Sequence, residues 1–125
     1  MLDWLKRLFG ISTLDVRPRK FAGQVKRCVK AAQRKTGLSC EALKRVRIVR
    51  ATRYVRSKSL RREVGVLENG ATGDWGPGSI RAAMDANGFV PDEVLEHEAA
   101  HQIAHENGLG GALHCAEFRG KIWNW

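Results

Sequence analysis

The sequence feature that most constrains the fold is the stretch 97–101, His-Glu-Ala-Ala-His, which reads H-E-x-x-H. Residues four apart lie on the same face of an α-helix, one turn above each other. On a helix, His97 and His101 can therefore hold one metal ion between them. Zinc binds imidazole nitrogen at about 2.0–2.1 Å, and this spacing supplies two such ligands. Glu98 then lies beside the ion, where it can accept a proton from a water whose pKa the ion lowers to about 7.

The residues around the motif predict the bounds of this helix. Pro91 and the acidic pair Asp92 and Glu93 are typical of a first turn, and Asn107-Gly108 is typical of a helix end. The helix is therefore predicted to span roughly Asp92 to Glu106. A mostly apolar stripe along it is predicted to pack against a sheet. The stripe consists of Val94, Leu95, Ala99, Gln102 and Ile103.

Two histidines do not complete a catalytic zinc site, which usually has three protein ligands and one open position. His105 is eight residues after the first histidine, about 12 Å along the axis, so it cannot share one ion with both residues of the motif. The glycine-rich break at 108–111 lets the chain reverse, and residues 112–123 are predicted to form a second helix. That helix could return either His114 or Glu117 to the ion, and the spacing leaves both possibilities open.

Two helices are predicted before any strand. Residues 1–11 form a short amphipathic segment, predicted to be a terminal helix docked on the domain, and residues 12–18 are predicted to be a connector. Residues 19–35 carry apolar side chains at helical spacing and end at Gly37. The predicted buried face of this helix consists of Phe21, Val25, Cys28, Val29 and Ala32.

Three strands are predicted to form a small sheet. Residues 44–56 are rich in strand-forming types and are predicted as one strand, bulged near Val49. Residues 60–67 and 79–84 are predicted as the other two strands. The glycine-rich segment 73–78 is predicted as a loop. An extended substrate is expected to pair with the edge of the last strand.

The net charge of +9 is very unevenly distributed along the chain. Residues 17–62 hold 17 Lys/Arg and one acid, whereas residues 63–125 hold three Lys/Arg and ten acids. So dense a basic half favours a phosphate-rich partner, above all nucleic acid. The less favoured alternatives are a basic surface that serves solubility and one that binds an acidic protein. Tyr54 is the only aromatic residue between Ala22 and Asn69, which favours contacts to the phosphate backbone over base stacking. The arginines predicted to hold phosphates are Arg47, Arg50, Arg53, Arg56, Arg61 and Arg62.

The cysteines and the hydropathy pattern predict the compartment. Cys28, Cys40 and Cys115 are odd in number and follow no recognisable spacing, which argues against a disulfide framework and a zinc ribbon. No apolar run approaches the length of a membrane span, and the first residues lack the order of a signal peptide. The chain is therefore expected to be cytoplasmic or associated with the nucleoid.

The segment His114–Phe118, His-Cys-Ala-Glu-Phe, resembles the H-G-x-E-F segment that follows H-E-x-x-H in SprT-like metalloproteases, the family that includes Spartan. The resemblance implies that His114 is the third zinc ligand beside His97 and His101, that Glu98 is the general base, and that Phe118 packs under the site. It implies an α+β fold with a minimal zincin-like core. The expected order is N-terminal helices, a small three-stranded sheet, the metal helix and a closing C-terminal helix, with residues 19–125 as one domain.

The same resemblance implies a zinc-dependent endopeptidase acting on proteins associated with nucleic acid. Two departures stand out: Cys115 replaces the usual glycine, and the interior of H-E-x-x-H is Ala-Ala. The pattern H-E-x-x-H-x-x-x-H, from His97 to His105, also resembles repressor-cleaving peptidases of the ImmA/IrrE class, which would make Glu117 the third ligand. A third possibility is a non-catalytic nucleic-acid-binding module that zinc stabilises through four protein ligands. A membrane-surface peptidase anchored by residues 1–11 is the least favoured alternative.

Overall fold

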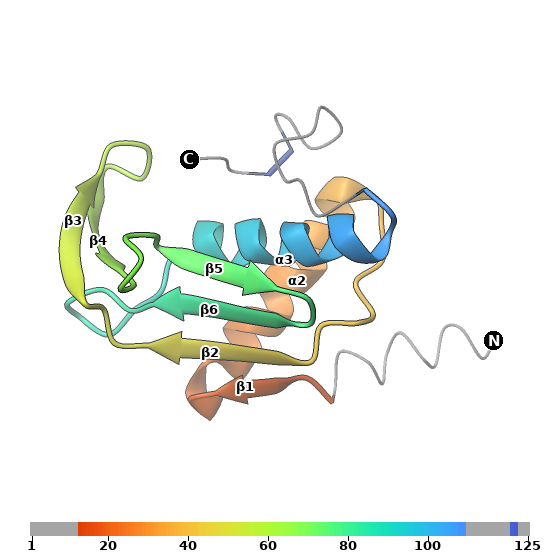
Figure 1. Cartoon of the computed structure of the whole chain (residues 1–125), viewed down its shortest axis with the longest axis horizontal. Helices are drawn as coiled ribbons and strands as arrows, with labels where there is room; N and C mark the ends of the chain where they lie inside the picture. The colour runs from red at the N-terminus through yellow and green to blue at the C-terminus, as the bar shows by residue number, and fades with distance from the viewer. Residues whose placement is uncertain (1–12, 110–120, 123–125) are drawn as a thin grey trace.

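The computed structural model describes residues 13–109 and 121–122, and Figure 1 shows the arrangement of their elements. The predicted helix at 1–11 lies outside the described residues, and so does the one at 112–123 apart from residues 121–122, which form a turn and a bend. His114, Cys115, Glu117 and Phe118 are thus not described. The elements are β1 (Asp15–Arg17), η1 (Arg19–Phe21), α2 (Ala22–Thr36), β2 (Arg45–Val49), β3 (Arg53–Ser57), β4 (Arg62–Val66), β5 (Gly73–Gly76), β6 (Ser79–Ala83) and α3 (Asp92–Glu106).

Four strands form one sheet in the order β1-β2-β6-β5. β1, β2 and β6 run parallel, and β5 pairs antiparallel with β6 at the edge. β3 and β4 form a separate antiparallel hairpin at the end of this sheet (Figure 1). Both long helices pack on one face of the four-stranded sheet, so the predicted α+β class is confirmed.

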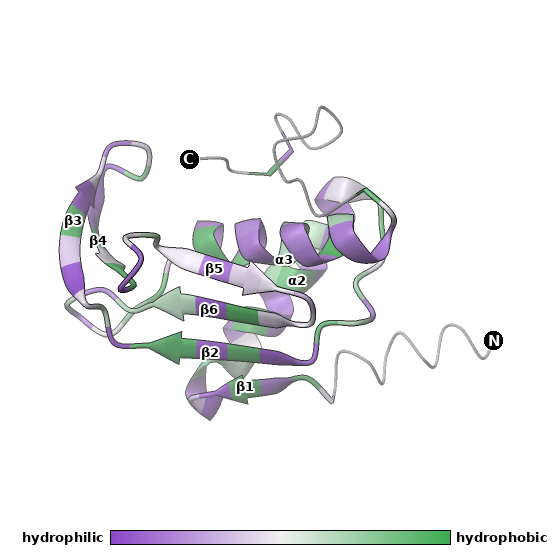
Figure 2. Cartoon of the chain, in the orientation of Figure 1, coloured by the Kyte–Doolittle hydropathy of each residue, from purple (hydrophilic) through white to green (hydrophobic). Residues whose placement is uncertain are grey.

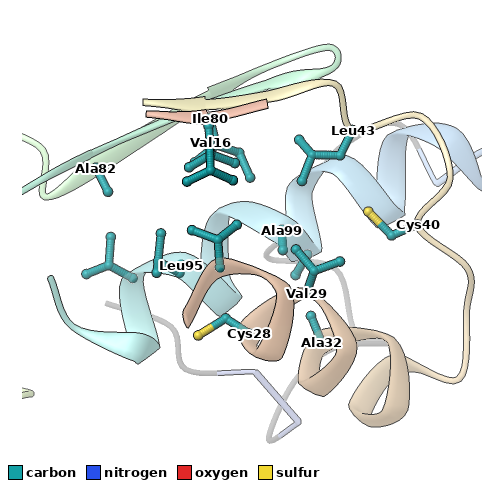
Figure 3. Packing of buried hydrophobic residues seen from close by; sticks show 14 of the residues in the cluster. Val16, Cys28, Val29, Ala32, Cys40, Leu43, Ile80, Ala82, Leu95 and Ala99 are labelled. Carbon is teal, nitrogen blue, oxygen red and sulfur yellow. The ribbon is translucent and has the colours of Figure 1, made fainter. Parts of the chain in front are cut away.

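The core forms between the sheet and the two helices because apolar residues alternate along the strands. Figure 2 shows this alternation along β2, where Val46 and Ile48 are buried on either side of Arg47. In Figure 3, Val16 and Ile80 point from the sheet toward α2 and α3. Small residues let the helices approach closely: Ala32, Ala99 and Ala100 are 0% exposed. The unusual Ala-Ala interior of H-E-x-x-H is thus explained by packing.

The two helices match their predictions. η1 and α2 cover the predicted 19–35 helix, and Gly37 ends α2 with φ +73°, a left-handed conformation that glycine adopts without strain. All five residues of its predicted buried face are buried. α3 has the predicted bounds. No helix among the described residues is long and apolar enough to cross a membrane.

The predicted sheet was wrong in several respects. The single strand predicted over 44–56 is two strands, because Arg45–Val49 pairs with β6 whereas Arg53–Ser57 pairs with β4. The segment 73–78, predicted as a loop, contains β5, which pairs with β6 over four residues. The predicted connector at 12–18 contains β1, which pairs with β2. The sheet therefore has four strands, with a separate hairpin, in place of three.

The predicted strand at 79–84 exists as β6, but its predicted role was wrong. β6 lies between β2 and β5, so both of its edges are already paired. The edge strands of the four-stranded sheet are β1 and β5, and β5 is the one that packs against α3. An extended peptide that adds to the sheet beside α3 would therefore have to pair with β5.

Gly65 in β4 fixes how the hairpin meets the sheet, since a Cβ there would lie 2.0 Å from the Met84 carbonyl oxygen and 2.7 Å from the Ala51 Cβ. We expect Gly65→Ala to lower the free energy of unfolding by about 3 kcal/mol, because backbone must move to accept the methyl group. Urea denaturation measures this change. The control Gly23→Ala, whose Cβ meets nothing within 4 Å in α2, should raise stability by about 0.5–1 kcal/mol. Equal stability of both variants would contradict this packing.

Candidate metal centre

The two histidines of the motif lie on one face of α3, as the sequence predicts. Their ring centroids are 5.1 Å apart with an interplanar angle of 75°. His97 is 3% exposed, whereas His101 is partly exposed. Two imidazoles one helical turn apart, with one of them open to solvent, fit the donor set of a zinc site that still needs a ligand from elsewhere.

Glu98 is a buried carboxyl with an unmatched oxygen. The side chain is 2% exposed, and its Oε2 atom has no hydrogen-bond partner among the described residues. Burial, and next the negative charge of Asp74, raise the pKa of Glu98 to about 8. An unpartnered buried carboxyl is costly in a purely structural role. The arrangement fits a group that exchanges a proton with a water or faces a cation.

Gly73 of β5 lets the sheet edge approach this carboxyl closely. A Cβ at Gly73 would lie 2.9 Å from the Arg81 carbonyl oxygen, 2.9 Å from Val94 Cγ1 and 3.2 Å from Glu98 Cγ. No larger residue fits there unless α3 or β5 shifts. The glycine that favoured a loop prediction is therefore a point of contact between the edge strand and the metal helix.

Trp75, two residues further along β5, packs against the second histidine. Its ring lies 5.7 Å from the His101 ring at 18°, a stacked arrangement, and 5.4 Å from the His105 ring at 57°. Stacking of this kind restricts the plane of the His101 imidazole. Sequence analysis placed Trp75 in a loop and gave it no role. Only its pairing within β5 brings it to the site.

Gln102 holds Trp75 in place. Its Oε1 atom accepts hydrogen bonds from the indole Nε1 of Trp75 at 3.0 Å and from the backbone N of Gly78 at 2.7 Å. Its Nε2 atom donates to Glu106 Oε1 at 3.2 Å. Gln102 is 1% exposed, so this amide is a buried polar group with its hydrogen bonds satisfied. The prediction that Gln102 belongs to the packed stripe of the helix is confirmed by its burial. The prediction did not include its hydrogen bonds to Trp75, Gly78 and Glu106.

Both ends of α3 are anchored to the rest of the domain. At the start, Gln24 Nε2 donates to Asp92 Oδ1 at 2.7 Å and to the Val90 carbonyl oxygen at 2.8 Å. At the end, the Glu106 carboxylate accepts hydrogen bonds from the backbone N of Glu41 and Ala42, at 2.7 and 3.1 Å. The helix that carries the site is thus fixed against α2 and the chain that leads into β2, which favours a preorganised site.

The contacts around α3 do not show where the predicted third ligand lies. His114 and the alternative Glu117 lie outside the described residues. Within residues 13–109 and 121–122, no group of three or more His, Cys, Asp or Glu side chains is positioned to hold a metal ion. The two described cysteines, Cys28 and Cys40, are buried free thiols, and burial raises the pKa of each to about 12.

The six arginines predicted to bind nucleic acid do not lie on one surface element. Arg47 is on β2, where its guanidinium binds Asp15 Oδ2 at 2.9 Å. Arg62 pairs with Glu93 at 3.5 Å. Arg62 begins β4 of the hairpin. The other four also belong to the hairpin or to the chain leading into it, and all are exposed. They are Arg50, Arg53, Arg56 and Arg61.

Three comparisons with known proteins give no match: no protein-family model, no curated protein and no solved structure is similar to this chain.

Proposed function

We propose that this chain is a zinc-dependent endopeptidase of the SprT-like type with a minimal zincin-like core. The observation that carries the proposal is the buried Glu98 carboxyl, whose Oε2 atom has no partner in the part of the chain that the structure describes. It lies next to two imidazoles at H-E-x-x-H spacing on one helix. His97, His101 and His114 would hold the ion. Bound zinc would polarise the scissile carbonyl and acidify a water.

Glu98 would act as the general base. As the neighbour of His97 on α3, its carboxylate would take a proton from the attacking water and return it to the leaving amine. Its burial against β5 excludes bulk water from one side of the carboxyl. Trp75 and Gln102 would keep the His101 ring in one orientation, and fixed ligand geometry favours both metal affinity and reaction.

The substrate would bind as an added strand on the edge of β5 that no other described strand pairs with. The strand β5 is an edge of the four-stranded sheet and packs against α3. Backbone groups on such an edge are available to an extended peptide, and pairing there would lay the peptide beside the two histidines. This route replaces the one expected along 79–84.

The basic half supports a nucleic-acid partner for the same protein, in the cytoplasm or on the nucleoid. Residues 50–62 hold six Lys/Arg and no acid, and all five arginines among them are exposed. Phosphate contacts of this kind give affinity without sequence preference and weaken with salt. Substrates associated with nucleic acid would then be concentrated near the metal centre.

The test is cleavage of an unfolded protein substrate by the purified chain. We expect cleavage with zinc present, loss of cleavage after chelation, and recovery when zinc alone is returned. Loss of the folded state on chelation, with no cleavage under any condition, would favour the alternative of a non-catalytic module that zinc stabilises. Cleavage that survives complete zinc removal would contradict the proposal.

A further inference from the structure

Two large hydrophobic side chains are exposed in the described part of the chain, and the fold brings their segments together. Tyr54 on β3 is 47% exposed and Phe89, just before α3, is 68% exposed. Tyr54 lines a surface hollow of about 250 Å³ together with Met84 and Gly88, the residue preceding Phe89. Phe89 is not itself a lining residue, but its neighbour Gly88 is, so the fold places the segment that carries Phe89 beside Tyr54.

The strand partner of Tyr54 leaves its ring uncovered. Tyr54 lies directly opposite Gly65 in the hairpin register, and opposed residues share one face of an antiparallel pair. Gly65 has no side chain to cover the ring, and the Met84 carbonyl oxygen fills the space where a Cβ would be. The hairpin thus presents an aromatic side chain at the rim of the hollow.

The lining of the hollow carries one arginine and one aspartate, and the hairpin beside it is basic, with Glu63 as the one acid in residues 50–66. Arg50 lines the hollow, and Arg56 is two residues beyond Tyr54, on the same face of β3. Asp85 also lines the hollow, but its Oδ1 atom accepts hydrogen bonds from the backbone N of Asn87 and Phe89, at 2.8 and 3.0 Å. The Asp85 carboxylate thus holds the turn, and Glu63 lies opposite Arg56 in the hairpin register. Arg50 is the cation that the hollow itself offers to an anion.

We propose that this hollow binds single-stranded nucleic acid, with Tyr54 and Phe89 stacking on bases and Arg50 and Arg56 contacting phosphates. Exposed aromatic rings interleaved with cations are what unpaired bases require, whereas a duplex hides its base faces. The inference rests on the nucleic-acid part of the proposed function and is independent of the peptidase chemistry.

The position of the hollow links it to the metal centre. Its lining residues at 84–86 and 88 lie a few residues before α3 begins at Asp92. Arg62 of the hairpin pairs with Glu93 in the first turn of that helix. Glu93 precedes His97 by one helical turn, about 6 Å along the axis. A strand bound at the hollow would hold associated proteins close to the two histidines.

The test is fluorescence anisotropy of a labelled twelve-nucleotide oligo-dT and of a matched duplex with the full-length chain. We expect Tyr54→Leu and Phe89→Ser, which leave the net charge unchanged, each to weaken single-strand binding about tenfold and duplex binding less than about twofold. Arg50→Gln should weaken single-strand binding more than Arg53→Gln, since Arg53 alternates to the opposite face of β3. Unchanged thermal midpoints would show that the variants fold.

Three results would overturn the inference. Single-strand binding that survives both aromatic changes would overturn it and leave the general nucleic-acid proposal standing. Equal losses for single strand and duplex would exclude stacking. Binding of an acidic peptide, but of neither oligonucleotide, would overturn both this site and the nucleic-acid part of the proposed function, and would leave the zinc peptidase proposal untouched.

Discussion

Glu98→Gln is expected to lower the rate of peptide cleavage about a thousandfold, because general acid–base catalysis contributes about 10²–10⁴-fold and an amide cannot accept the proton. Glutamine has nearly the same shape, so the packing against Gly73 should persist. The substitution also removes a carboxyl that is 2% exposed and unpartnered at Oε2 among the described residues. Zinc content and thermal midpoint should therefore be maintained. The loss is measured as the ratio of kcat/KM on a fluorogenic peptide between the parent chain and the variant.

The matched control is Glu96→Gln on the same helix. Glu96 pairs with Lys35 away from the two imidazoles, and an ion pair at the surface contributes about 1 kcal/mol or less. This variant should keep its activity within about twofold. Full activity of Glu98→Gln, or an equal loss in both variants, would exclude Glu98 as the base.

Gly73→Ala is expected to lower kcat about a hundredfold and the free energy of unfolding by about 1–3 kcal/mol. The added methyl group would press on Arg81 and Val94 and push against Glu98 Cγ, which lies 3.2 Å from the Cβ position. A displacement of about 1 Å at a catalytic group can cost about 10² in rate. Since neither imidazole is touched, zinc should remain bound. Steady-state kinetics and urea denaturation measure the two effects.

Gly76→Ala is the control for this prediction. Gly76 is on the same strand, but a Cβ there would meet nothing within 4 Å. Its activity and stability should stay close to those of the parent chain. If Gly73→Ala retained full activity, the contact between β5 and Glu98 would have no part in catalysis.

The parts of the fold that the sequence predicted depend on local signals. α3 was predicted from Asp92 to Glu106 because a first-turn Pro-Asp-Glu and a terminal Asn-Gly mark its ends. The strand errors have a non-local origin. Gly-Asp-Trp-Gly has the composition of a turn, and only its pairing with β6 makes it a strand. The break at residues 50–52 likewise depends on which partner each half of 44–56 finds.

In the candidate site, too, the sequence predicted what local spacing encodes and missed what depends on contacts between distant segments. His97, Glu98 and His101 were predicted because their chemistry requires a fixed spacing on one helix. Trp75 and Gln102 were missed, since their contacts cross from β5 to α3 and no sequence spacing encodes them. Gln102 offered one signal that could have been used: a polar amide inside an apolar stripe usually needs buried hydrogen-bond partners.

The central claim is that imidazoles of α3 and one downstream residue hold a single zinc ion. Zinc per chain, measured by elemental analysis after dialysis, tests it most directly. The account predicts about one zinc in the parent chain, in His105→Ala and in Glu117→Ala, and almost none in His101→Ala and His114→Ala. Full zinc occupancy in His101→Ala would contradict the account, and loss in Glu117→Ala but not in His114→Ala would overturn the SprT-like assignment.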